Sequence, residues 1–172
     1  GGSVRVGSNV GLCLCGSERC EPTLESPGEL AGPDANEVFP LLVDRQRRLW
    51  VGGLDDWAPG RDRVAFRDAT TPSGPWTEIR DGSGRPIRGA IAATEAPNGD
   101  VLLVTASEGL VSVDQGKATR IGVADGLSSD RLRSAYADPQ GIVWIGTEDA
   151  GLCRWTPRDG HVRCLTVADG LY

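Results

Sequence analysis

The sequence predicts an all-β fold built from tandem units of short antiparallel strands. The first observation is the segment Asp138–Thr147, in which a Pro-Gln-Gly turn precedes a short apolar strand around Trp144. Weaker copies surround three positions that lie successively 42, 52 and 45 residues further back: Leu102, Trp50 and Arg5. A repeat of roughly 40–50 residues made of short strands is typical of propeller blades. We therefore expect the four-stranded antiparallel blades of a β-propeller.

Two further observations support tandem repetition. The pentapeptide Val-Ala-Asp-Gly-Leu occurs at 123–127 and again at 167–171, 44 residues later, at the corner that closes each of two units. The 172 residues also include 24 Gly and 11 Pro, a composition that suits many tight turns and few long helices. No helical period is long enough to predict a helix.

The repeats predict a single β-propeller fragment over residues 1–172, an open arc of about four blades from a larger propeller. The approximate blade units are 1–36, 37–88, 89–130 and 131–172. The first unit lacks its first strand, and the chain stops at Tyr172 before a strand that could replace it. We expect such an arc to have apolar end faces. Because the sequence does not begin with Met, we also expect it to be part of a longer protein.

The strands are expected in the following order. The first unit begins at its second strand, 4–8, and ends in a polar corner loop, 25–36. The second unit has β-rich runs at 37–43, 49–51, 64–66 and 76–79, with an insertion at 55–62. The third unit has runs at 90–94, 101–105, 109–113 and 118–121. Turn residues separate the runs, as in antiparallel meanders.

The fourth unit, 131–172, is the clearest. Its expected strands are 132–137, 142–145, 152–155 and 161–165. The first two are joined by Asp138-Pro-Gln-Gly141, which has Pro and Gly at the positions that a β-turn favours. The last two flank Pro157-Arg-Asp-Gly160, a second hairpin turn. The run 142–145 is entirely apolar, which predicts a strand buried on both faces.

Three segments together resemble the two-component regulator propeller repeat: Asp138-x-x-Gly-x-x-Trp-Ile-Gly-Thr147, the pair Gly151-Leu152 and the linker Asp125-Gly-Leu127. The resemblance covers nearly the whole chain and is strongest in residues 120–172. It implies β-propeller blades in the sensor region of histidine kinases and related signalling proteins, in the periplasm or elsewhere outside the cytoplasm. It also implies that this segment is not an enzyme, because any kinase or cyclase activity would lie outside these residues.

Physical chemistry favours a structural role for the repeated motif. Trp50 and Trp144 can fill the wedge between neighbouring blades, since one buried aromatic ring covers about 150–250 Å². The residues that follow the second tryptophan complete the structural blade motif: Gly146, Thr147, Gly151 and Leu152. Other copies depart from it, with Gly53, Leu102 and Arg5 at the aligned positions. Ligand stacking on the tryptophans remains an alternative, and the ligand-binding residues are unknown from the sequence.

Two pairs among the five cysteines are symmetric about a predicted hairpin turn, Cys153 with Cys164 and Cys15 with Cys20. Directly opposed residues on antiparallel strands have Cβ atoms about 4.5–5.5 Å apart, close to the ~3.5–4.5 Å that a disulfide requires. Both pairs are therefore candidate disulfides, with Cys13 left over as a buried or free thiol, and the sequence leaves open whether the cysteines are oxidised. Such pairing indicates an oxidising compartment.

Metal and catalytic sites are the alternatives for these cysteines. The cluster at 13–20 could supply half of a zinc site, but the only histidine, His161, lies in another unit. His161 and Cys164 are three residues apart on one strand, so they point to opposite faces and do not suit a catalytic dyad. The densest acidic set lacks the spacing of a calcium loop and is predicted to be solvated: Asp55, Asp56 and Asp62. We expect no catalytic residue, metal or cofactor.

The composition restricts the classes of partner that this chain can bind. A net charge of −6 and a pI near 4.8 argue against nucleic acid, which requires a basic face. No apolar run approaches the ~20 residues that span a bilayer, so we expect no direct membrane insertion. The predicted function is a ligand-sensing or signal-relaying propeller segment, whose partners are further blades of the parent chain and a small-molecule or glycan ligand. A propeller-type lyase or glycan-processing enzyme and a protein-interaction scaffold are the alternatives.

Overall fold

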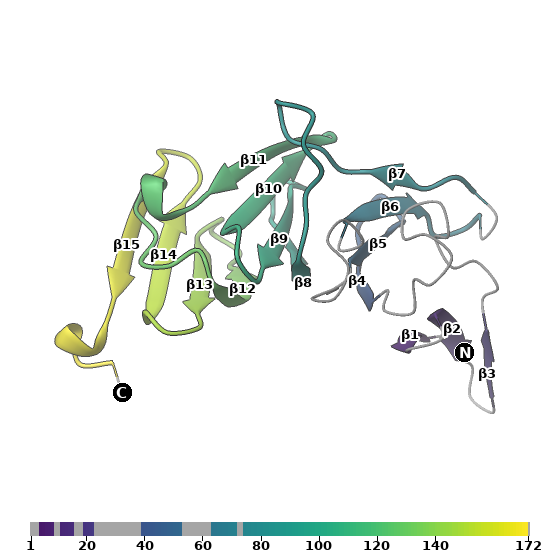
Figure 1. The fold of residues 1–172 in the computed structure, drawn as a ribbon, viewed down its shortest axis with the longest axis horizontal. Helices are drawn as coiled ribbons and strands as arrows, with labels where there is room; N and C mark the ends of the chain where they lie inside the picture. The colour runs from purple at the N-terminus through teal and green to yellow at the C-terminus, as the bar shows by residue number, and fades with distance from the viewer. Residues whose placement is uncertain are drawn as a thin grey trace. The chain divides into compact units, whose positions relative to one another are not determined.

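The strands of this chain form antiparallel sheets throughout. The structure, a computed structural model, describes residues 4–8, 11–15, 19–22, 39–52, 63–71 and 74–171. Contacts divide the chain into two compact units, Gly1–Ile79 with Pro86–Ala90 and Arg80–Arg85 with Ile91–Tyr172. Within the described residues there are one three-stranded and three four-stranded sheets, each a meander in chain order (Figure 1). The predicted all-β class with four-stranded antiparallel sheets is confirmed.

The first unit contains two of these sheets. The three-stranded sheet consists of β1 (Val4–Ser8), β2 (Gly11–Cys15) and β3 (Cys20–Pro22). The four-stranded sheet consists of β4 (Phe39–Val43), β5 (Arg48–Gly52), β6 (Ala65–Asp68) and β7 (Thr77–Glu78). The predicted corner loop 25–36 and insertion 55–62 lie outside the described residues. The division into four blade units and the open arc remain predictions.

The second unit contains the sheets that the sequence predicts most clearly. One consists of β8 (Ala90–Glu95), β9 (Val101–Thr105), β10 (Leu110–Asp114) and β11 (Lys117–Ile121). The other consists of β12 (Leu132–Ala137), β13 (Val143–Thr147), β14 (Leu152–Thr156) and β15 (His161–Leu165). Two 3₁₀ turns, η1 (Val123–Asp125) and η2 (Val167–Asp169), occupy the repeated pentapeptides. No helix in the described part of the chain is long and apolar enough to cross a membrane.

The core of the second unit lies between its two sheets. One face of β9–β11 packs against one face of β13–β14 in a single cluster that includes Leu102, Val104, Leu110, Ile121, Val143, Ile145, Cys153 and Trp155. Removing this apolar surface from water stabilises the pair of sheets, at about 25 cal/mol per Å². Face-to-face packing of successive four-stranded meanders is the arrangement expected of propeller blades.

The strand around Trp144 is buried on one face only, so the prediction of two-sided burial for 142–145 is wrong. Val143 and Ile145 are fully buried, whereas Trp144 is half-buried. Successive side chains of a strand point to opposite faces. Val143 and Ile145 therefore face β8–β11, and Trp144 lies on the opposite face of its sheet. An apolar run cannot by itself show whether its second face is covered.

The turn that precedes the motif strand has one backbone geometry in three sheets. In the last sheet, Asp138 N donates to Ile142 O and Gly141 N donates to Asp138 O. The same pair of bonds joins Ala96, Gly99 and Asp100, and joins Asp44, Arg47 and Arg48. The residue at the glycine position has positive φ in every copy: 82° at Gly141, 93° at Gly99 and 62° at Arg47. The sequence alignment that placed Trp50, Leu102 and Trp144 in register therefore holds at the backbone level.

Candidate functional site

The motif aspartate anchors both the turn and the tryptophan that follows it. Asp138 Oδ1 accepts hydrogen bonds from the backbone N of Gln140 and Ile142, both at 2.9 Å, and Oδ2 accepts one from Trp144 Nε1 at 3.4 Å. The equivalent Asp44 accepts from Arg48 N at 2.8 Å and from Trp50 Nε1 at 2.8 Å. The aspartate thus satisfies backbone donors at the turn and the indole donor of the strand.

In the first unit this arrangement is closed to ligands. Trp50 is fully buried, its ring centroid is 4.9 Å from that of Phe66, and the Arg48 guanidinium lies 5.1 Å from its centroid. Burial acts to raise the pKa of Asp44, but hydrogen bonds from Trp50 and Arg48 outweigh it and hold the pKa below its usual value. A buried, ionised and fully bonded carboxylate beside a buried indole supports the structural interpretation of this copy.

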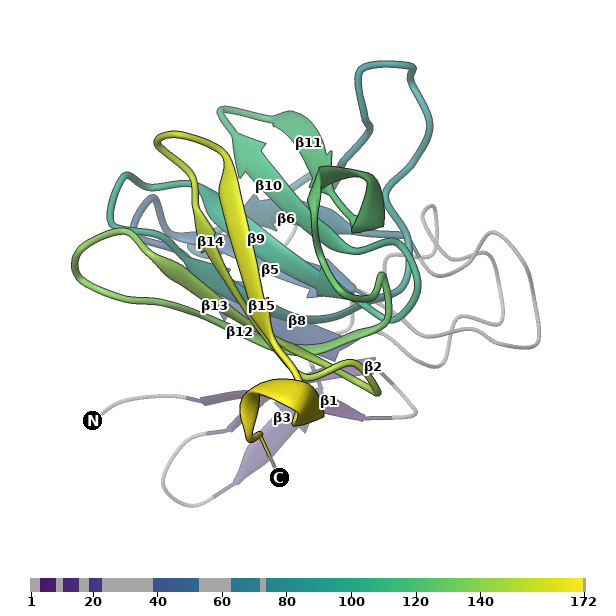
Figure 2. The same ribbon diagram turned by 90° about the vertical axis from the view of Figure 1, so that its left-hand side faces the viewer.

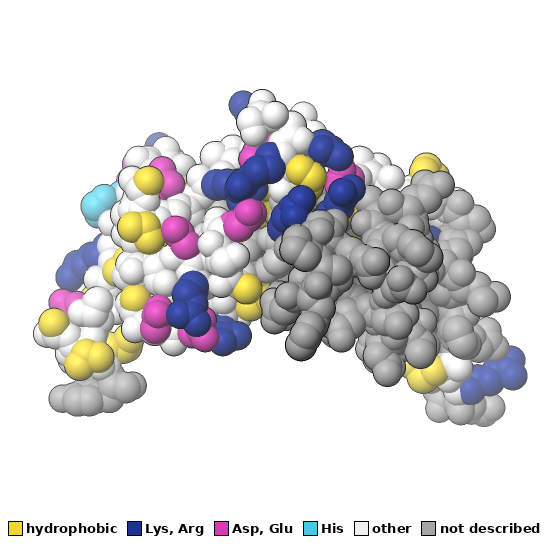
Figure 3. All heavy atoms as spheres, viewed as in Figure 1, with side chains coloured by type: hydrophobic (Ala, Val, Ile, Leu, Met, Phe, Trp, Pro, Cys, Tyr) yellow, Lys and Arg dark blue, Asp and Glu magenta, His cyan; other side chains and the backbone are white. Residues whose placement is uncertain are grey.

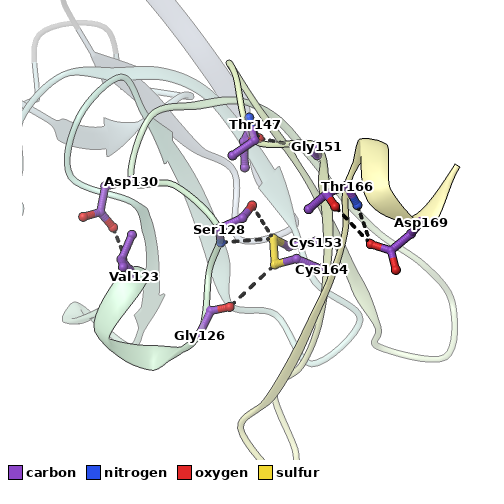
Figure 4. The surroundings of a disulfide bond; sticks show 11 residues. Val123, Gly126, Ser128, Asp130, Thr147, Gly151, Cys153, Cys164, Thr166 and Asp169 are labelled. Atoms are coloured by element: carbon purple, nitrogen blue, oxygen red, sulfur yellow. Dashed lines mark hydrogen bonds between the residues drawn. A yellow bond between two sulfur atoms is a disulfide. The ribbon is translucent and has the colours of Figure 1, made fainter. Parts of the chain in front are cut away.

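A second repeated set of hydrogen bonds follows the motif strand. Thr147 Oγ1 donates to Gly151 O at 2.8 Å and accepts from Ala150 N at 3.0 Å (Figure 4). Thr105 and Gly109 repeat the first bond at 2.7 Å, and Glu108 N repeats the second at 2.8 Å. Gly151 has φ of 89° and Gly109 has φ of 76°. The Gly-Thr…Gly-Leu part of the motif therefore builds a tight turn between the second and third strands. Its role as structural blade motif stays a proposal, which these contacts support.

Both candidate disulfides are present. Cys153 and Cys164 are direct cross-strand partners on β14 and β15, and Cys15 and Cys20 are direct partners on β2 and β3. The Cys153–Cys164 bridge also contacts the linker that enters β12, because Ser128 Oγ lies 3.2 Å from Cys153 Sγ (Figure 4). A disulfide sulfur can only accept, so the serine hydroxyl is the donor. The bridge therefore joins two strands and the chain segment that connects the two sheets.

His161 and Cys164 lie on the same strand, β15, but do not form a catalytic pair. His161 is exposed, whereas Cys164 packs toward the core cluster, as expected for residues on opposite faces of β15. Cys164 is also bonded to Cys153 and cannot act as a thiolate nucleophile. Among the described residues, no group of three or more His, Cys, Asp or Glu side chains is placed to hold a metal ion. The acidic set Asp55, Asp56 and Asp62 lies outside the described residues, as does the Cys13 side chain.

A cluster of four charged residues in the second unit was not predicted from the sequence. Glu108 pairs with Arg85 at 3.1 Å and with Arg120, and Asp81 lies 3.6 Å from Arg85 and 3.5 Å from Arg120. Ser83 Oγ also donates to Asp81 at 2.6 Å. This serine hydrogen bond is the main reason that the pKa of Asp81 falls to about 2, and backbone N–H donors and Arg120 lower it further. Basic and acidic side chains lie interspersed on the visible face of the described residues (Figure 3).

The Asp81 cluster predicts an acid-dependent loss of stability. Because the pKa of Asp81 is lower in the folded protein than in the unfolded chain, its contribution is complete above about pH 4 and is lost as pH falls toward 2. We expect Asp81→Asn to lower the urea midpoint at pH 6 and to differ little from the parent at pH 2. Urea titrations between pH 2 and 6 measure this, with the exposed Asp114→Asn as control. A difference that does not change with pH would contradict it.

The second unit also contains a cleft of about 650 Å³ beside three of its turns. The turns are those between β8 and β9, between β12 and β13, and between β14 and β15. Each contributes one proline and at least one polar side chain, and the polar set is Asn98, Asp100, Gln140, Arg154, Thr156 and Arg158. Within the described part of the chain, Arg154 and Arg158 have no hydrogen-bond or ion-pair partner for their guanidinium groups. The ligand-binding residues were unknown from the sequence, and these turns were not identified from it.

Comparison with known families supports the resemblance. Residues 126–149 match the family model described as two component regulator propeller. This match includes the motif segment, so the predicted resemblance to that repeat is confirmed there. No curated protein matches the sequence.

Several solved structures share the fold. The extracellular domain assigned to the hybrid two component system BT3049 of B. thetaiotaomicron is 19% identical, with a TM-score of 0.71 over 99% of this chain and 22% of that chain. The corresponding domain of BT4673 is 18% identical, with a TM-score of 0.68 over 95% of this chain and 23% of that chain. Virginiamycin B lyase from Staphylococcus aureus is 15% identical, with a TM-score of 0.60 over 94% of this chain and 54% of that chain. The chain thus spans less than a quarter of the length of the first two.

Proposed function

We propose that this chain, which carries a two component regulator propeller repeat at 126–149, is a ligand-sensing segment of an extracytoplasmic β-propeller. Its similarity to extracellular domains assigned to two-component systems supports this location. The two disulfides support it independently, since such bonds persist in oxidising compartments. Signalling chemistry such as phosphoryl transfer would lie elsewhere in the parent protein.

The observation that carries ligand sensing is the cleft beside the three turns. Arg154 and Arg158 bring two cationic groups without partners in the described residues to a concave surface, and guanidinium groups bind carboxylates through paired hydrogen bonds. Asn98 and Gln140 add amide donors and acceptors that suit hydroxyl groups. Proline rings provide apolar surface between them. This set of groups fits a glycan fragment that carries carboxylates.

Thermal-shift measurements on the full-length protein test this proposal. A galacturonic acid trimer is expected to raise Tm progressively with concentration, because a ligand of the folded state adds RT ln(1 + [L]/Kd) to stability. A neutral galactose trimer is expected to raise it much less. Arg158→Glu should abolish the shift, and Lys117→Glu, an exposed charge reversal on the neighbouring sheet, should leave it intact. If the two trimers act equally, or if neither acts, the cleft is not an acidic-glycan site.

The similarity to a lyase keeps an enzymatic role as the second candidate. Incubating the full-length protein with the same glycans and following products by mass spectrometry separates the two. Turnover that a single Asp or His substitution abolishes would overturn the sensor proposal. Binding without turnover supports it. If no small ligand raises Tm, a protein-interaction scaffold becomes the better-supported function.

A further inference from the structure

The cleft beside the three turns contains a carboxylate as well as two arginines. The turns that border it lie at one end of their two sheets (Figure 2). Arg154 and Arg158 come from the sheet β12–β15, whereas Asp100 directly precedes β9 of the neighbouring sheet. Of the described residues that line the cleft, Asp100 is the only acid. The cleft therefore presents both signs of charge, each from a different sheet.

The turn that precedes β9 does not require the carboxylate of Asp100. In the equivalent turn of the last sheet, Asp138 Oδ1 accepts a hydrogen bond from the backbone N of Ile142. In the turn before β9, Ala96 replaces that aspartate, and Asn98 Oδ1 accepts from Asp100 N instead, at 3.2 Å. The backbone donor is thus satisfied by an amide side chain. The residue aligned with Asp100 in the last sheet is the apolar Ile142, so the turn geometry does not explain an acid at this position.

The carboxylate of Asp100 is poorly satisfied by the protein. Asp100 is half-buried, and its one hydrogen-bond donor among the described residues is Ser112 Oγ, 3.4 Å from Oδ2. Because O–H···O hydrogen bonds are usually about 2.5–3.0 Å long, this contact is weak. By contrast, Asp159 in the turn between β14 and β15 accepts a hydrogen bond from His161 N at 3.0 Å. A carboxylate that is partly removed from water without a good partner costs free energy, and a cationic group of a ligand would recover it.

We infer that the ligand of this cleft is an acidic amino sugar, with a carboxylate that binds the arginines and an unsubstituted amine that binds Asp100. The inference rests on the proposed function, because Arg154 and Arg158 must hold the carboxylate of the ligand. The protonated amine donates charge-assisted hydrogen bonds to Asp100, and bonds of this kind are the stronger ones. A ligand with carboxylates alone would instead bring negative charge toward Asp100. The volume of about 650 Å³ is within the range of about 300–1,000 Å³ that is typical of ligand sites.

Calorimetric titration of the full-length protein at pH 6 tests the inference with two forms of one sugar. The probe is a disaccharide of galacturonic acid and galactosamine with its amine free, compared with the same disaccharide N-acetylated, which removes the charge. The free-amine form should bind about tenfold more tightly. Asp100→Asn should abolish this preference by weakening the free-amine form, and should bind the galacturonic acid trimer no less tightly than the parent. Asp114→Asn, an exposed acid at the end of β10, is the matched control and should keep the preference.

The comparison of the two disaccharides uses the unmodified protein, so it does not depend on the folding of a variant. Equal affinity for both forms, with the galacturonic acid trimer still bound, overturns the inference and leaves the proposed function in place. A preference that persists in Asp100→Asn assigns the amine to another group, or the discrimination to the bulk of the acetyl group, and also overturns the inference. If none of the three sugars binds, the proposed function fails and the inference fails with it.

Discussion

Replacing Cys153 and Cys164 together by alanine is expected to lower the free energy of unfolding by about 3 kcal/mol. The two residues are 11 apart in sequence, and closing a loop of this size removes that much chain entropy from the unfolded state. Cys153 is fully buried, so the lost sulfur also leaves a small void beside Val143 and Ile145. Urea unfolding monitored by tryptophan fluorescence measures the change.

Matched controls separate the cross-link from the packing. The Cys15–Cys20 bridge closes a shorter loop, with a separation of 5. By the same relation, the Cys15→Ala, Cys20→Ala variant should lose about 2 kcal/mol of unfolding free energy. Reductant added during unfolding should destabilise the parent protein through both bridges and the Cys153→Ala, Cys164→Ala variant only through Cys15–Cys20, so the stability difference between the two proteins should shrink. Equal stability of the parent and this variant would show that the bridge is not formed in solution.

The disulfides show why hairpin register could be predicted from the sequence. A compact turn fixes which residues of the two strands face each other, so symmetry about 157–160 is enough to pair Cys153 with Cys164. The same rule pairs Arg154 with Arg163, which have the same centre. The signal for this arginine pair was therefore present in the sequence, although the prediction used only the cysteines.

Other features depend on contacts that no local pattern specifies. Asp81 reaches Arg120 because residues 80–85 lie beside β11, where Asp81 forms an isolated bridge with Ala118. The cleft requires three turns from two sheets to meet. The exposure of Trp144 depends on what covers the second face of its sheet, which an apolar run cannot report. Strand positions followed from apolar runs and turn residues, whereas the charge cluster and cleft required tertiary structure.

Gly151→Ala is expected to be the most damaging single substitution in the repeated motif, at about 3 kcal/mol or more. Its φ of 89° lies where a Cβ is disfavoured, which costs roughly 1–2 kcal/mol. An added Cβ would also collide with the carbonyl oxygen of Leu165 on β15. That oxygen belongs to the backbone, so relief requires β14 and β15 to move apart. Gly109 is placed in the same way, with its added Cβ 2.5 Å from Ile121 O.

Gly160→Ala separates these two effects within the same sheet. Gly160 also has positive φ, 70°, but an added Cβ there has no atom within 4 Å. Gly160→Ala should therefore lower the free energy of unfolding only by the cost of the backbone conformation, about 1 kcal/mol. Urea midpoints of the two variants and the parent measure the difference. If Gly151→Ala costs no more than Gly160→Ala, close approach to β15 is not what requires glycine there. The Gly-Leu part of the motif would then be a conformational requirement of the turn alone.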